Sequence, residues 1–94
     1  MKNIKNIRDE IDTVDKGIVE LIAKRSKLVH NLADFKSSID EIKDKGRIDE
    51  VLQNVRGNAI SLNLSPNLIE EVYSYIIDEM VEMEIAEFEN KKVF

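Results

Sequence analysis

Four cationic side chains lie within or beside apolar stripes of predicted helices: Arg8, Arg25, Lys36 and Arg47. If residues 3–37 form a helix, Arg25 lies about 40° from Leu21 and about 60° from Leu28 around its axis. That position is inside the stripe that a helical bundle would bury. An unpaired charge in a core costs on the order of several kcal/mol. The four cations therefore indicate either internal ion pairs or a site for an anion.

The residue types say which anion would fit. Arginine presents a planar fork that matches a carboxylate, and lysine is a point charge that reaches a single oxygen. Three arginines and one lysine facing inward would suit a small dicarboxylate. The alternative is that each cation pairs with an inward carboxylate, such as Asp15 or Glu84, and Arg8 with Asp15 is one such pair. The residues alone leave both interpretations open.

Other chemistries find little support in the sequence. The chain has no cysteine, which excludes disulfides and thiolate metal sites. Its single histidine, His30, is predicted to face solvent, and its serines have no inward histidine partner. No metal-ligand spacing and no glycine-rich phosphate loop is found. The sequence therefore predicts no metal and no cofactor.

Composition narrows the fold class. The chain of 94 residues is 35% charged, with one proline and three glycines, which favours a single all-α domain over residues 1–94. A net charge of −5 argues against nucleic acid as a partner. No signal peptide and no apolar run of membrane-spanning length is present, so a cytoplasmic location and no membrane partner are expected.

The first predicted helix, Asn3–Ser37, dominates the architecture. Its apolar residues repeat every three or four positions over the whole segment. At about 1.5 Å per residue it would be roughly 50 Å long, against a radius of gyration of about 12–13 Å for a compact domain of this size. The rest of the chain is too short to cover such a rod. The sequence therefore predicts a homodimer in which two long helices pack along each other.

A polar loop is predicted at Ser37–Lys45, followed by a second helix. Its apolar positions keep the helical spacing from Ile48 to Ala59. Gly57, followed by Asn58, is expected to weaken the end of this helix, at a cost of about 1 kcal/mol.

The third helix has a clear start, with Ser65 as N-cap and Pro66 in the first position. Glu84 interrupts its apolar stripe, four residues after Met80, and residues 90–94 are expected to fray. The stripe consists of Ile69, Val72, Tyr73, Ile76, Ile77, Met80 and Met83.

These residues together resemble a known family, the all-helical chorismate mutases of the AroQ class. The resemblance covers about residues 4–88, and its pieces are more specific in combination than alone. They are Ile7-Arg8-Asp9-Glu10-Ile11-Asp12-x-Val14-Asp15, Leu21-Ile22-Ala23-Lys24-Arg25, Phe35-Lys36, Arg47 and Val72-Tyr73-Ser74-Tyr75-Ile76-Ile77.

The resemblance implies a fold and a reaction. The fold is an intertwined homodimer of three-helix chains whose sites are built from both subunits. The reaction is the pericyclic rearrangement of chorismate to prephenate in aromatic amino acid biosynthesis, with no cofactor and no covalent intermediate. By this resemblance Arg8 reaches a substrate carboxylate from the partner chain, and Arg25 binds one from its own chain. Lys36 contacts a carboxylate and the ether oxygen, and Arg47 orders the ring side.

The chain departs from the family pattern at three positions. Ile48 stands where a glutamate usually holds the ring hydroxyl, and Met80 stands where a serine near a carboxylate is common. Glu84 replaces a glutamine that donates to the ether oxygen; as a carboxylic acid, it could still donate. Asp44 would contact the ring hydroxyl, in a connection from Lys36 to Arg47 that is about one residue shorter than usual.

These departures keep other functions open. An apolar residue at Ile48 is found in related isochorismate-pyruvate lyases, which form salicylate. Mutases acting on 4-amino-4-deoxychorismate are another alternative, because an altered ring substituent also relaxes this position. A hypothesis of a different class is a non-catalytic regulatory helical dimer.

Overall fold

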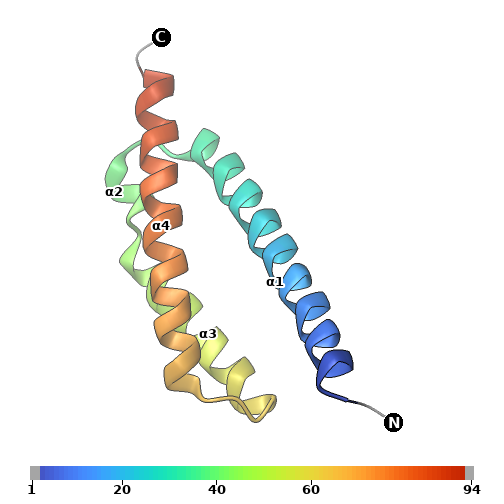
Figure 1. Ribbon diagram of the computed structural model, residues 1–94. Coiled ribbons are helices and arrows are strands. Elements are labelled where there is room, and N and C mark those ends of the chain that lie inside the picture. Colours follow the sequence, from blue (N-terminus) through green and yellow to red (C-terminus); the bar gives the residue numbers. More distant parts are fainter. Residues whose placement is uncertain (1–2, 93–94) are drawn as a thin grey trace.

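The computed structural model describes residues 3–92, and this part of the chain forms helices and no strand (Figure 1). The all-α prediction is therefore confirmed. The elements in order are α1 (Ile4–Leu32), a 3-10 turn (Ala33–Phe35), the short α2 (Ile39–Ile42), α3 (Lys45–Ser61) and α4 (Pro66–Lys92). None of the helices described is both long enough and apolar enough to cross a membrane.

α3 and α4 form an antiparallel hairpin, and α1 joins α4 only near its own C-terminal end (Figure 1). Three side-chain contacts mark the junction: Arg25 with Met80, Ser26 with Met83, and His30 with Glu87. Towards its N-terminus α1 diverges from the hairpin. The molecule is therefore elongated, with a radius of gyration of 16.8 Å and extents of 60 × 27 × 15 Å.

The first helix ends earlier than Ser37. α1 stops at Leu32, the 3-10 turn follows, and Lys36 is extended with φ −97° and ψ 140°. The predicted loop is also wrong in part, because α2 forms within it. Ser38 caps α2 by accepting from the Glu41 backbone N–H at 3.2 Å, and the Glu41 carboxylate accepts from the Ser37 backbone N–H at 2.7 Å. A serine followed three residues later by glutamate is the capping-box signal that the loop prediction overlooked.

The second helix continues past Gly57 to Ser61. It ends where Asn63 adopts the left-handed conformation, with φ 58°, and the Leu64 backbone N–H returns to the Ala59 carbonyl at 2.9 Å. This helix end needs a residue that tolerates positive φ, and asparagine does so better than most.

The third helix begins as predicted, with Pro66 in its first position. The Ser65 hydroxyl accepts a hydrogen bond from the Leu68 backbone N–H at 3.2 Å. Residues 90–92, which were expected to fray, still belong to α4, and residues 93–94 lie outside the described part.

The core of a single chain is small, and α1 contributes nothing to it. Among the side chains that the structure describes, the buried ones are Ala33, Ile42, Ala59, Ile77, Met80 and Glu84. No residue of α1 is buried, and its apolar stripe is open to solvent, from Ile4 at 70% exposed to Leu32 at 49%. The chain therefore leaves its longest apolar surface uncovered.

We expect Ser65→Ala to lower the free energy of unfolding by about 1 kcal/mol, because the first turn of α4 loses its capping acceptor. Urea unfolding at a fixed protein concentration measures this difference. Ser61→Ala is the matched control, since that hydroxyl only donates to the Gly57 carbonyl one turn back. Equal effects of the two substitutions would contradict the capping role.

Candidate active site

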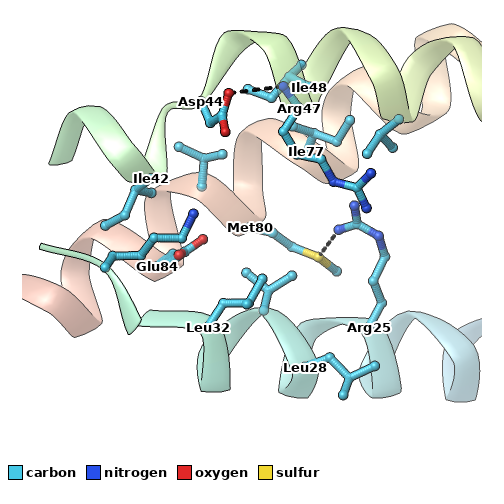
Figure 2. A pocket seen from close by; sticks show the side chains of 14 residues that line it. Arg25, Leu28, Leu32, Ile42, Asp44, Arg47, Ile48, Ile77, Met80 and Glu84 are labelled. Carbon is cyan, nitrogen blue, oxygen red and sulfur yellow. Dashed lines mark hydrogen bonds between the residues drawn. The ribbon is translucent and has the colours of Figure 1, made fainter. Parts of the chain in front are cut away.

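A pocket of about 410 Å³ lies where α1, the α2–α3 connection and α4 meet (Figure 2). Its wall combines three cations and two acids with nine apolar side chains. The polar members are Arg25, Lys36, Arg47, Asp44 and Glu84. The apolar members are Leu28, Val29, Leu32, Ile42, Ile48, Val51, Ile77, Met80 and Val81.

The fold gathers most of the residues that the sequence singled out. Seven of the eight line this pocket: Arg25, Lys36, Asp44, Arg47, Ile48, Met80 and Glu84. The exception is Arg8, which lies 17 residues before Arg25 on α1, a distance of about 26 Å along the helix. Arg8 is exposed and forms no ion pair with any residue of the described range 3–92. The pair with Asp15 is thus not formed.

Arg25 is half-buried and points from α1 toward α4 (Figure 2). Its Nη1 donates to the Met80 sulfur at 2.7 Å, and its guanidinium carbon lies 5.9 Å from the centre of the Tyr73 ring. No carboxylate in the described part of the chain forms an ion pair with it. Arg25 therefore keeps an uncompensated positive charge at the pocket wall.

Lys36 is half-buried in the extended segment after the 3-10 turn. Its Nζ donates to the Glu41 backbone carbonyl at 3.1 Å, which fixes the ammonium without neutralising it. Glu41 is the third residue of α2, so the capping of this short helix helps to position Lys36.

Glu84 is the only buried charged or polar residue among the side chains described, at 5% exposed. Its Oε2 has no hydrogen-bond partner in the described part of the chain. Burial raises the pKa of Glu84 above its ordinary value, and the positive charge of Lys36 works in the opposite direction. Burial thus shifts Glu84 toward the protonated form, and only that form of a carboxyl group can donate a hydrogen bond.

The first turn of α3 supplies the remaining polar side chains. Asp44 is the N-cap of this helix, and its Oδ1 accepts from the Arg47 backbone N–H at 3.1 Å (Figure 2). Arg47 is exposed and forms an ion pair with Glu50, one turn further along α3. Ile48 is half-buried and adds an apolar face to the pocket beside these charges.

Sequence reasoning missed Tyr73 and most of the apolar wall. Tyr73 was placed in the core stripe of the third helix, but its ring also faces the Arg25 guanidinium. Tyr73 lies seven residues before Met80, which puts both side chains on one face of α4. This spacing could have indicated that Tyr73 lies near the site. Val51 and Val81 gave no such signal, because only the tertiary packing brings them to the pocket.

This arrangement suits binding and electrostatic stabilisation of a compact anion. Cations act most strongly on developing charge when apolar walls exclude water. The same pocket offers no serine, histidine or cysteine as a nucleophile among its lining residues. Elsewhere in the described part of the chain, no group of three or more acidic or histidine side chains gathers in a way that could hold a metal ion.

Comparison with known proteins agrees with this geometry. The family model described as chorismate mutase type II matches residues 7–85. The bifunctional chorismate mutase/prephenate dehydratase of Buchnera aphidicola subsp. Schizaphis graminum is 36% identical over 80 residues, which cover 84% of this chain and 21% of that protein. The T-protein of Enterobacter agglomerans is 36% identical over 74 residues, covering 78% of this chain and 20% of that protein.

The chain thus spans about a fifth of the length of these curated relatives. The family match itself extends from the first turn of α1 to the part of α4 that carries Glu84, and so includes every element that lines the pocket. This chain belongs to the chorismate mutase type II family.

Proposed function

We propose that this chain catalyses the rearrangement of chorismate to prephenate, a step in aromatic amino acid biosynthesis, with residues 1–94 acting as one catalytic domain. The observation that carries the proposal is the state of the pocket cations. Neither Arg25 nor Lys36 forms an ion pair with a carboxylate of the described chain, although both line an apolar pocket. Membership of the family and the name of the Buchnera aphidicola relative point the same way.

The reaction needs a compact substrate conformer and stabilisation of charge at the breaking C–O bond. The fork of Arg25 holds one carboxylate, and the apolar wall excludes water around the ring. Lys36 and protonated Glu84 serve the ether oxygen, where negative charge develops. No covalent intermediate is required, because binding and electrostatics carry the catalysis.

A second copy of the chain completes the site. α1 leaves its apolar stripe exposed and carries Arg8 on the part that diverges from its own α4 (Figure 1). Packing two α1 helices along each other would bury these stripes and bring Arg8 of each chain to the pocket of the other. Arg8 then supplies the second carboxylate contact.

Ile48 favours a second candidate function. Its side chain gives the pocket an apolar face next to Asp44 and Arg47, so no hydrogen-bond partner for a ring hydroxyl comes from this position. An isochorismate-pyruvate lyase, or a mutase acting on 4-amino-4-deoxychorismate, would use such a wall. A non-catalytic regulatory dimer is the alternative of another class.

Product analysis distinguishes these functions. Purified protein is incubated separately with chorismate, isochorismate and 4-amino-4-deoxychorismate, and products are separated by chromatography. We expect prephenate from chorismate. Salicylate with pyruvate from isochorismate would support the lyase instead, and rearrangement of the amino compound alone would assign the third substrate. Turnover of none of them would support the non-catalytic dimer.

Shared sites predict a specific complementation result. Arg8→Ala and Arg25→Ala should each lower kcat/KM by about a hundredfold or more, since each removes a carboxylate contact. If Arg8 acts across the dimer, a mixed dimer has one site with both defects and one intact site. Co-refolding equal amounts should then restore roughly a quarter of the wild-type activity.

The outcome also tests the dimer itself. No recovery after co-refolding, with both variants inactive alone, would mean that Arg8 serves the site of its own chain. Wild-type activity of Arg8→Ala would exclude Arg8 from the site. Lys24→Ala, which removes an exposed charge next to Arg25, is the control and should retain wild-type activity.

Glu84 predicts a pH dependence. The acid must be protonated to donate a hydrogen bond, and its folded-state pKa is raised by burial. Activity should therefore increase as the pH falls from about 8 to about 5, as the protonated fraction grows. Glu84→Gln keeps a donor at every pH and should flatten the profile of kcat/KM. Glu82→Gln, which alters an exposed carboxyl on the same helix, should leave the wild-type profile intact; a flat wild-type profile would contradict the role of Glu84.

A further inference from the structure

The contact between Arg25 and Met80 is unusual for a half-buried cation. Nη1 of Arg25 lies 2.7 Å from the Met80 sulfur, and the two residues are 55 positions apart in the chain. Met80 is buried, at 7% exposed, and both side chains line the pocket (Figure 2). The interaction therefore connects α1 to α4 at the wall of the site itself.

The chemistry of the acceptor decides what this contact does. A thioether sulfur is a weak, uncharged acceptor, so it orients the guanidinium without neutralising it. The Tyr73 ring, 5.9 Å from the guanidinium carbon, adds a second restraint that also leaves the positive charge in place. A carboxylate at position 80 would instead form an ion pair and compete with an anionic ligand.

One turn further along α4, the same helix presents a different group to a different cation. Glu84 lies on the same face as Met80, and the positive charge of Lys36 acts to lower its pKa. α4 thus gives an uncharged acceptor to Arg25 and a titratable acid to Lys36. In the pocket, the Met80 contact fixes the direction of the Arg25 guanidinium, because Arg25 donates directly to the sulfur.

We propose that Met80 is a positioning residue, which holds the Arg25 guanidinium in the orientation that receives a ligand carboxylate. The inference rests on the proposed function for the identity of the ligand, but the orientation of Arg25 is a property of the free protein. With Nη1 directed to the sulfur, the remaining N–H groups of the fork are left for the carboxylate. Arg25 then loses less conformational freedom when the ligand binds.

Kinetic constants separate this role from a catalytic one. The ligand carboxylate is charged in both the ground state and the transition state. Its interaction with Arg25 therefore contributes equally to the binding free energy of both. Loss of the sulfur acceptor should therefore raise KM and leave kcat nearly unchanged. A general loosening of the fold would instead lower the concentration of active protein and reduce apparent kcat.

The experiment compares two substitutions at position 80. Met80→Leu keeps the apolar volume and removes the acceptor; we expect it to raise KM for chorismate about fivefold, with kcat within about twofold of wild type. Met80→Gln restores an acceptor oxygen at a similar reach and should return KM to within about twofold of wild type. Met83→Leu is the matched control, because Met83 lies on the same helix but accepts from Ser26.

A second readout needs no activity. The chain has four arginines, so the side-chain resonances of ¹⁵N-labelled protein can be assigned one by one. In the ligand-free wild type, restrained rotation of the Arg25 guanidinium should give separate Nη signals. Met80→Leu should merge them into averaged signals, and Met80→Gln and Met83→Leu should not.

The kinetic constants and the Arg25 resonances test the proposed function and the role of Met80 separately. If the wild type turns over no chorismate, the proposed function is wrong, and the Arg25 resonances alone still decide the role of Met80. Unchanged KM and unchanged Arg25 signals in Met80→Leu would overturn the positioning role. Equal increases of KM in Met80→Leu and Met80→Gln would also overturn it, because packing and not the acceptor would then be responsible.

Discussion

The rest of the structure depends on the length of α1, which exceeds what the other helices of the described chain cover. α1 has 29 residues, about 43 Å of helix, and the α3–α4 hairpin contacts it only around residues 25–30. Beyond that junction, no part of the chain that the structure describes buries its apolar stripe. The same constraint places the pocket, because Arg25, Leu28 and Leu32, which line it, lie in the C-terminal part of α1 that approaches α4 (Figure 1). In the proposed dimer, the uncovered part of α1 becomes both the interface and the carrier of Arg8.

Within the pocket, the balance of charge is the second controlling feature. Arg25 and Lys36 are held by a sulfur and a backbone carbonyl, neither of which carries a full charge. Arg47 is the exception, since it pairs with Glu50 at the exposed rim. Neither of these two cations pairs with a carboxylate, and both lie in an apolar wall. Their desolvation costs free energy in the empty protein, and an anion that enters the pocket offsets that cost. This supports ligand binding over internal ion pairing for these two residues.

Glu84 also affects the charge of the pocket, because its carboxyl group can carry a negative charge. A buried carboxylate beside Lys36 would offset part of the positive charge, whereas the protonated acid leaves it available to a ligand. The raised pKa of Glu84 follows from its burial and favours the protonated form. In the proposed mechanism, the protonated acid is a hydrogen-bond donor in the pocket, and activity then depends on pH through Glu84.

The sequence by itself determined the helices, the identity of the cations and the family. The periodicity of three and four, the cap at Ser65 and Pro66, and the absence of strand patterns are local signals, so they could be interpreted without tertiary information. Seven of the eight selected side chains line one pocket: the cations and Glu84 were chosen for lying within or beside an apolar stripe, and Asp44, Ile48 and Met80 were chosen from the family resemblance. The end of α1 and the formation of α2 were missed, since caps and helix ends depend on a few side-chain contacts.

Only the tertiary structure decided what each charge contacts. Sequence spacing put Arg25 within an apolar stripe, but it could not show a methionine 55 residues away as its acceptor. Nor could it show that, within residues 3–92, Arg8 lacks an ion-pair partner and Glu84 has a carboxyl oxygen without a hydrogen-bond partner. The physical reason is that charge and hydrogen-bond energies depend on distance and burial, which packing between helices sets and the periodicity of one helix does not.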